Sequence, residues 1–232
     1  MSLMQPKSGM FRKFAGITLI GHPADEKKYR ELLPTGLDLP NEPAISLFIV
    51  DYTDVHPWPM SPYGEGGMFL RCHYKGQDYW HTLSMPVTRK VPLWGGRYMG
   101  YPKYLADTIF VKEGDTHWEA IIQNKGKTIL GFRFREGVVR DVSSLELGLI
   151  SQNSFFWGGD SLNLYPSGRG PTKKIVKLRH MVEPKWEPQY GMIDVDPESI
   201  DGISALIDFD TPYVGMANTF RGGINLLSEE VK

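Results

Sequence analysis

The sequence has very little cysteine and no long hydrophobic run. Cys72 is its one cysteine, which excludes a disulfide within the chain, and we interpret it as a small buried apolar residue. The longest apolar stretches, such as residues 44–50, are far too short to span a bilayer, so no membrane association is expected. The first residues lack a basic segment followed by an apolar core, which argues against a signal peptide, and residues 1–3 are interpreted as a candidate vector-derived segment.

An excess of charge of one sign is also absent. The 232 residues include 26 Lys and Arg against 27 Asp and Glu, a balance that does not favour a nucleic-acid partner, and we expect a cytoplasmic protein. The six histidines follow none of the spacings typical of metal sites. The glycine clusters at residues 64–67 and 95–100 lack the motifs of phosphate or dinucleotide binding. The sequence therefore predicts neither a metal nor a cofactor.

Glycine and proline occur 25 and 17 times and are spread along the whole chain, a distribution typical of many short strands joined by turns. The pattern predicts strands over residues 17–21, 44–52 and 173–182, hairpins formed by 67–74 with 79–84 and by 116–123 with 128–135, helices over 24–33 and 197–207, and a solvated basic loop over 168–174. Successive hairpins with few helices favour an antiparallel sheet that closes into a barrel or packs as a sandwich. The length fits a single domain over residues 1–232.

Two segments carry the residues of greatest chemical interest. Residues 61–67 read SPYGEGG, and residues 96–106 read GRYMGYPKYLA. Most lysines are exposed and passive, and a glutamate among glycines is equally well read as an exposed turn carboxylate. However, Lys103 stands between proline and aromatic residues, where it can be stiff and desolvated. Burial of this kind lowers the pKa of an ammonium group and leaves a nucleophilic amine.

These two segments, in this order and spacing, resemble the acetoacetate decarboxylase family. The resemblance rests on the GYPK-x-L-A string, on the glycine-arginine pair before it, and on the aromatic-x-Glu-Gly segment that contains Glu65. It implies a mainly β (α+β) fold, in which a closed cone-shaped antiparallel β-barrel carries a few short peripheral helices. It also implies that Lys103 forms a Schiff base with a keto acid, that Glu65 helps to arrange the substrate, and that the chain forms a homo-oligomer.

The resemblance further implies a set of substrate-binding residues, and it includes two departures. The implied residues are Arg12, Arg97, Tyr63, Tyr101 and Tyr104, although Tyr101 and Tyr104 are also open to interpretation as ordinary core residues. Tyr104 occupies the position of a second lysine in the family's archetype, and Tyr98 follows Arg97 where the archetype has glutamate. The first departure removes a neighbouring cation that would lower the pKa of the reactive lysine. Burial alone can lower a lysine pKa by about 3–5 units.

The sequence leaves three functional hypotheses open. The first is a decarboxylase of a β-keto acid such as acetoacetate, acting through an imine on Lys103. The second keeps the Schiff base but makes the enzyme an aldolase or dehydratase that acts on a larger keto acid. The third is a non-catalytic barrel that binds a small ligand.

Overall fold

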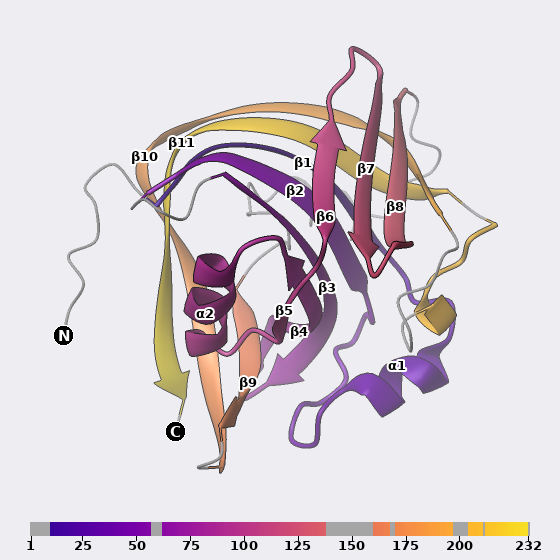
Figure 1. Cartoon of the computed structure of the whole chain (residues 1–232). Helices are drawn as coiled ribbons and strands as arrows, with labels where there is room; N and C mark the ends of the chain where they lie inside the picture. Colours follow the sequence, from indigo (N-terminus) through magenta and orange to yellow (C-terminus); the bar gives the residue numbers. More distant parts are fainter. Residues whose placement is uncertain are drawn as a thin grey trace.

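The computed structural model describes residues 10–56, 62–137, 160–167, 170–196, 204–210 and 212–231, and within them the chain is mostly β (Figure 1). The strands are β1 (Phe11–Gly21), β2 (Ile45–Val55), β3 (Tyr63–Tyr74), β4 (Gln77–Val87), β5 (Lys103–Leu105), β6 (Thr108–Lys112), β7 (His117–Asn124), β8 (Lys127–Glu136), β9 (Ser161–Ser167), β10 (Gly170–Val195) and β11 (Tyr213–Val231). The helices are α1 (Glu26–Leu32), α2 (Lys90–Tyr98) and the short 3-10 turn η1 (Ser204–Leu206). No helix in the described ranges is long and apolar enough to cross a membrane.

All described strands belong to one large sheet. Its order is β11-β1-β2-β3-β4-β9-β10-β8-β7-β6, and β5 pairs with the end of β4. Neighbours are antiparallel, except that β4 pairs in parallel with β5 and β9. β10 also pairs with β11, so this strand of 26 residues contacts β8, β9 and β11. The predicted mainly β class is confirmed, whereas closure of the sheet into a barrel stays a prediction.

The expected hairpins and the first helix are confirmed, and β3, β4 and β8 are longer than the sequence predicted. The β3–β4 turn uses Lys75 and Gly76, and the β7–β8 turn uses Lys125 and Gly126, all with positive φ. Two consecutive positive φ angles give the turn whose twist matches that of paired antiparallel strands. α1 begins after Asp25, whose carboxylate accepts a hydrogen bond from the Lys28 backbone N–H at 2.9 Å and so caps the helix.

In the C-terminal half, the loop expected over residues 168–174 was wrong, and the helix expected over residues 197–207 is described only in part. Residues 168–174 were expected to form a solvated loop, but residues 170–174 lie in β10 and pair with β9. Lys174 is buried, and its Nζ donates to the Tyr98 carbonyl at 2.6 Å, so a polar stretch became a strand through contacts with distant residues. Of the helix expected over residues 197–207, residues 197–203 lie outside the described residues, and Ser204–Leu206 form η1.

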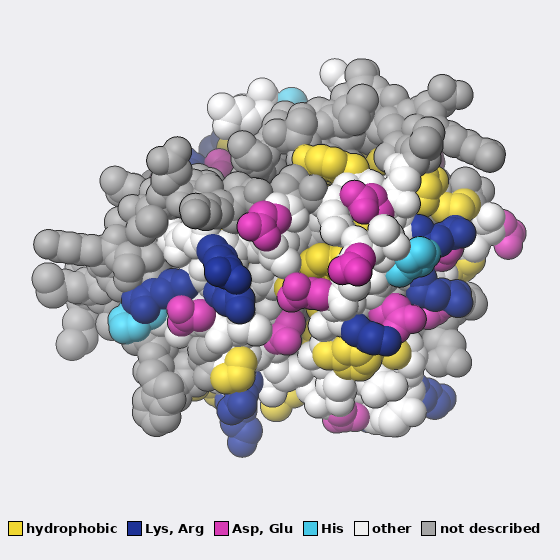
Figure 2. All heavy atoms as spheres, turned by 90° about the horizontal axis from the view of Figure 1, so that it is seen from above, with side chains coloured by type: hydrophobic (Ala, Val, Ile, Leu, Met, Phe, Trp, Pro, Cys, Tyr) yellow, Lys and Arg dark blue, Asp and Glu magenta, His cyan; other side chains and the backbone are white. Residues whose placement is uncertain are grey.

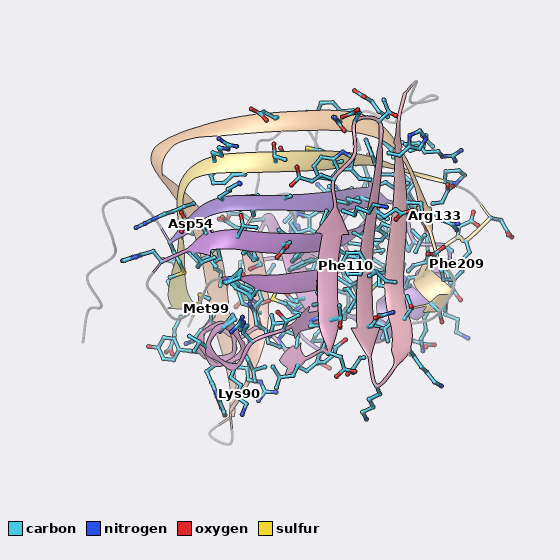
Figure 3. All side chains as sticks on the ribbon, turned by 45° about the horizontal axis from the view of Figure 1, so that its top comes forward. Asp54, Lys90, Met99, Phe110, Arg133 and Phe209 are labelled. Carbon is cyan, nitrogen blue, oxygen red and sulfur yellow. The ribbon has the colours of Figure 1, made fainter. Side chains whose placement is uncertain are left out.

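The two faces of the long strands carry different cores. Along β2, Ile45, Leu47 and Ile49 pack on one face, against β6, β7 and β8, which cross the long strands in Figure 3. Phe48 and Val50 point to the opposite face, because successive side chains of a strand alternate. We call this opposite face the aromatic face; it is formed by Phe14, Phe48, Val50, Tyr52, Tyr63, Phe69, Tyr101 and Phe220.

The environment of Cys72 agrees with the sequence interpretation. Cys72 is fully buried, and burial raises the pKa of its thiol to about 12, so it is an inert apolar residue as predicted. On the face of the molecule seen in Figure 2, basic and acidic side chains are interspersed.

Candidate active site

Lys103 is held in place by a short strand that follows helix α2. The chain reverses at Gly100, whose φ of +86° suits glycine, and then enters β5, where Lys103 pairs with Met85 of β4. The Lys103 N–H donates to the Tyr101 carbonyl at 2.8 Å, and the Lys103 carbonyl accepts from Arg97 Nε at 2.9 Å. These contacts fix the backbone from which the lysine side chain extends onto the aromatic face.

The amine of Lys103 contacts the carboxylate of Glu65. Glu65 lies on β3, opposite Val50 of β2 and Val87 of β4. Lys103 Nζ donates to Glu65 Oε2 at 2.7 Å, and the two side chains are only 6% and 5% exposed. The reading of Glu65 as an exposed turn carboxylate is therefore wrong. Removing water from two opposite charges costs free energy that a close, hydrogen-bonded contact offsets, so neither residue is a typical surface side chain.

Tyrosine rings surround this pair. Burial, and then the negative charge of Glu65, raise the pKa of Tyr63 and Tyr52 well above the ordinary phenol value. Burial likewise raises the pKa of Tyr101, whose ring centroid lies 6.0 Å from Lys103 Nζ, within cation–π range. All three phenols therefore keep their protons at neutral pH and can donate hydrogen bonds.

Sequence reasoning missed Tyr52. Its ring centroid lies 4.8 Å from that of Tyr63, and the two residues pair directly across β2 and β3. The signal was present in the alternation of Phe48, Val50 and Tyr52 along the predicted strand. What the sequence did not supply was the register that sets Tyr52 opposite Tyr63.

A second buried network holds Tyr101. The Tyr101 hydroxyl lies 2.8 Å from Ser161 Oγ, and Ser161 Oγ also accepts a hydrogen bond from Asn163 Nδ2 at 3.5 Å. Thr82 Oγ1 donates to Asn163 Oδ1 at 2.8 Å. All four side chains are almost fully buried, so these bonds fix the Tyr101 ring beside the lysine. None of the three partners was predicted, because they come from β4 and β9, far from Tyr101 in sequence.

The other predicted site residues lie in different positions. Arg97 is exposed, and its guanidinium lies over the Trp94 ring at 5.8 Å while its Nε supports the Lys103 backbone. Tyr104 follows Lys103 in β5, so it faces the other side of the strand, where its hydroxyl accepts from Ser84 Oγ at 3.4 Å. Arg12 is half-buried on β1, next to a register shift and two strands away from Glu65. The structure thus brings Lys103, Glu65, Tyr63 and Tyr101 together. Arg97 contacts the backbone of Lys103, and Tyr104 lies on the opposite face of β5.

Gly96 of α2 packs directly on the lysine side chain. A Cβ atom at this position would overlap with Cδ and Cε of Lys103 and lie 3.0 Å from Nζ. A glycine is therefore required for the helix to approach the lysine this closely.

We expect Gly96→Ala to displace the Lys103 amine and to reduce any reaction at that amine by about 100-fold, the effect of a misplacement of about 1 Å. Gly95→Ala is the matched control, because a Cβ atom at Gly95 meets nothing within 4 Å, and alanine favours a helix over glycine by about 0.5–1 kcal/mol. Steady-state rates and thermal unfolding of both variants check this. Equal losses of rate in the two variants would show that the contact with Lys103 is not what matters.

Fold and site together define a mainly β protein with a buried lysine–carboxylate pair on an aromatic face of its sheet. The model of the family described as acetoacetate decarboxylase (ADC) matches residues 6–158. The chain belongs to the acetoacetate decarboxylase family. A comparison with curated proteins found no match.

Solved structures share the fold at low sequence identity. An acetoacetate decarboxylase from Legionella pneumophila subsp. pneumophila str. Philadelphia 1 is 17% identical, with 97% of this chain and 86% of that chain covered and a TM-score of 0.68. The enduracididine biosynthesis enzyme MppR complexed with pyruvate is 14% identical, with 99% and 92% covered and a TM-score of 0.69. An acetoacetate decarboxylase-like enzyme from Sphingomonas wittichii RW1 is 15% identical, with 94% and 92% covered and a TM-score of 0.62.

Proposed function

We propose that this protein is a Schiff-base enzyme that decarboxylates a β-keto acid such as acetoacetate through an imine on Lys103. The observation that carries the proposal is the buried contact of Lys103 Nζ with Glu65 Oε2 at 2.7 Å, surrounded by phenols and closed off by Gly96. A lysine amine in a dry, preorganised site is the group that forms imines with ketones. Membership of the acetoacetate decarboxylase family supports the same reaction.

The chemistry follows from the positions of these groups. Glu65, at hydrogen-bond distance, takes up the proton of the Lys103 ammonium group, and the neutral amine then attacks the ketone carbon. Loss of water gives a protonated imine, into which the electrons of the breaking bond to the carboxylate flow, so carbon dioxide leaves and an enamine forms. Protonation of the enamine carbon and hydrolysis then release the ketone and the free lysine. In this scheme Tyr63 and Tyr101 donate hydrogen bonds to the adduct, and Arg12 contacts the substrate carboxylate.

The proposal also covers the domain organisation, the closure of the sheet, the oligomeric state and the cellular location. We propose one domain over residues 1–232 whose sheet closes into a cone-shaped barrel, supported by the pairing of β10 with β9 as well as with β11. We also propose a cytoplasmic homo-oligomer, in keeping with the family resemblance. Trp94 and Tyr98, exposed by 64% and 69%, support a contact between copies near α2.

A second candidate is a Schiff-base aldolase or dehydratase acting on a larger keto acid. It is supported by Tyr104, which stands beside Lys103 where the family's archetype has a lysine, and by the fold shared with MppR, a protein solved with a condensation product of pyruvate and imidazole 4-carboxaldehyde. The two candidates share the imine and differ in the bond that breaks next.

Borohydride trapping tests the proposal. The protein is incubated with acetoacetate, with longer and aromatic β-keto acids and with α-keto acids, then reduced and analysed by intact mass and peptide mapping. We expect a reduced adduct on Lys103, with release of carbon dioxide from at least one β-keto acid. An adduct without carbon dioxide release would favour the aldolase or dehydratase. If a folded sample forms no adduct with any of these compounds, both Schiff-base hypotheses fail and the non-catalytic ligand-binding barrel is the hypothesis that remains.

A further inference from the structure

Two polar side chains on the aromatic face are buried in an unusual way. Thr18 on β1 is 4% exposed, and Asn218 on β11 is 1% exposed. Within the described part of the chain, Thr18 Oγ1 and Asn218 Oδ1 have no hydrogen-bond partner. Buried polar atoms in proteins nearly always have a partner, because leaving one unpaired costs free energy. These two oxygens therefore point to a bound group that supplies the missing hydrogen bonds.

The strand register connects these residues to Glu65. Asn218 pairs with Gly16 of β1, Gly16 pairs with Val50 of β2, and Val50 pairs with Glu65 of β3. Directly paired residues point to the same face, so Glu65 and Asn218 end one row that crosses four strands. Thr18 lies on the same face, two residues along β1 from Gly16. Between Asn218 and Glu65 the row contains only Gly16, which has no side chain, and Val50.

The adjacent row of the same face is entirely aromatic. It runs from β11 to β3 through Phe220, Phe14, Tyr52 and Tyr63. Successive ring centroids in it are 4.5, 5.5 and 4.8 Å apart. An apolar chain lying along the Glu65–Asn218 row would therefore contact rings over its whole length.

The length of the row sets the size of what it can hold. Three strand spacings correspond to about 14 Å along the sheet. Acetoacetate, with four carbon atoms, cannot touch Lys103 and Asn218 together. A molecule that does so needs an extended chain beyond its ketone.

We propose that Thr18 and Asn218 bind a neutral hydrogen-bonding group, such as a hydroxyl, at the far end of a medium-chain keto acid whose ketone reacts at Lys103. The proposal rests on the function proposed above and narrows its substrate class. The unpaired Asn218 Oδ1 can only accept, and Thr18 Oγ1 can donate or accept. The bound group must therefore carry a donor, which a hydroxyl has and a carboxylate lacks. The apolar middle of the chain lies along the aromatic row.

The test compares two probes, β-keto-decanoate and its ω-hydroxy derivative, in the wild type and in Thr18→Val and Asn218→Leu. The readouts are the rate of carbon dioxide release and the yield of the borohydride adduct on Lys103 at limiting probe. We expect the wild type to prefer the hydroxylated probe by about tenfold in kcat/KM, and each variant to lose most of that preference. Thr53→Val is the matched control, because Thr53 is exposed on β2, and it should keep the preference.

The outcomes separate this inference from the function on which it rests. An adduct on Lys103 with equal rates for the two probes in the wild type would overturn the distal subsite and leave the imine chemistry standing. The same holds if the preference persists in both variants. Absence of any adduct, with these probes and with acetoacetate, would overturn the proposed function and the subsite together. Thermal unfolding guards against misfolding, since Thr18→Val removes an unpaired hydroxyl and should not lower Tm.

Discussion

Replacing Lys103 with arginine is expected to lower carbon dioxide release from a β-keto acid by about 10⁴-fold or more, the scale of losing a covalent nucleophile. A guanidinium stays protonated and cannot form an imine, yet it keeps a positive charge opposite Glu65. The variant therefore separates chemistry from the ion pair. Initial rates, together with the mass after borohydride reduction, measure the loss, and circular dichroism verifies the fold.

The matched control for this prediction is Lys174→Arg. Among the lysines whose side-chain burial the structure describes, Lys174 is the other buried one, and its Nζ contacts the Tyr98 carbonyl and the Tyr98 ring. We expect this variant still to form the adduct on Lys103, and Lys103→Ala to form none. A wild-type adduct that maps to Lys174, or a Lys103→Arg protein as active as the wild type, would show that the nucleophile has been misassigned.

Much of the site could be predicted because its signals are local. The GYPK string marks Lys103 and the PYGEGG string marks Glu65, although the predicted strand began only at residue 67 and the observed strand begins at Tyr63. The contact between the two residues, 38 positions apart, depends instead on how β3, β4 and β5 align. The β3–β4 ladder contains a register shift at Met68 and Phe69. Such a shift changes which side chains face the core, and alternation in the sequence does not reveal it.

Helix α2 could not be predicted from its own residues. Gly95 and Gly96 each disfavour a helix by about 1 kcal/mol relative to alanine, whereas Pro92 lies in the first turn, where proline is tolerated. The helix forms because its buried side packs on β4 and β5, with Leu93 in the aromatic core and Gly96 against Lys103. The requirement for glycine is a tertiary contact, so the sequence shows the residue but not its reason.

Strand β10 was underestimated for a related reason. Its sequence contains Pro184 and Pro188, which usually exclude a central strand, and a polar start that resembles a loop. Pairing with β11 nevertheless continues through Pro188, which lies opposite Asn218. β9 and β8 pair with β10 only at residues 170–176 and 191–195, so among the described pairings Pro188 lies where β11 alone is the partner, a position that tolerates proline. The strands β8 and β11 that extend β10 beyond its predicted end are separated from it in sequence.

The stability of the Lys103–Glu65 pair gives the second large prediction. Lys103→Met and Glu65→Gln, each made alone, are expected to lower the free energy of unfolding by about 3–5 kcal/mol, because each leaves one buried charge without its partner. The double variant leaves neither charge behind. Its loss should therefore be much smaller than the sum of the two, with a coupling free energy of at least about 2 kcal/mol.

Urea unfolding of the four proteins at pH 7 measures this coupling, and the exposed pair of Lys112 and Glu119 is the control. Lys112 Nζ lies 3.7 Å from Glu119 Oε2, and the two side chains are 73% and 60% exposed. Solvent screening should therefore leave almost no coupling free energy between these two residues. Additive effects at Lys103 and Glu65 would mean that no charge is buried in the pair, and Glu65 could not then act as the carboxylate that takes the proton from Lys103. Strong coupling would establish a buried acceptor in contact with the amine, which is what imine formation in a dry site requires.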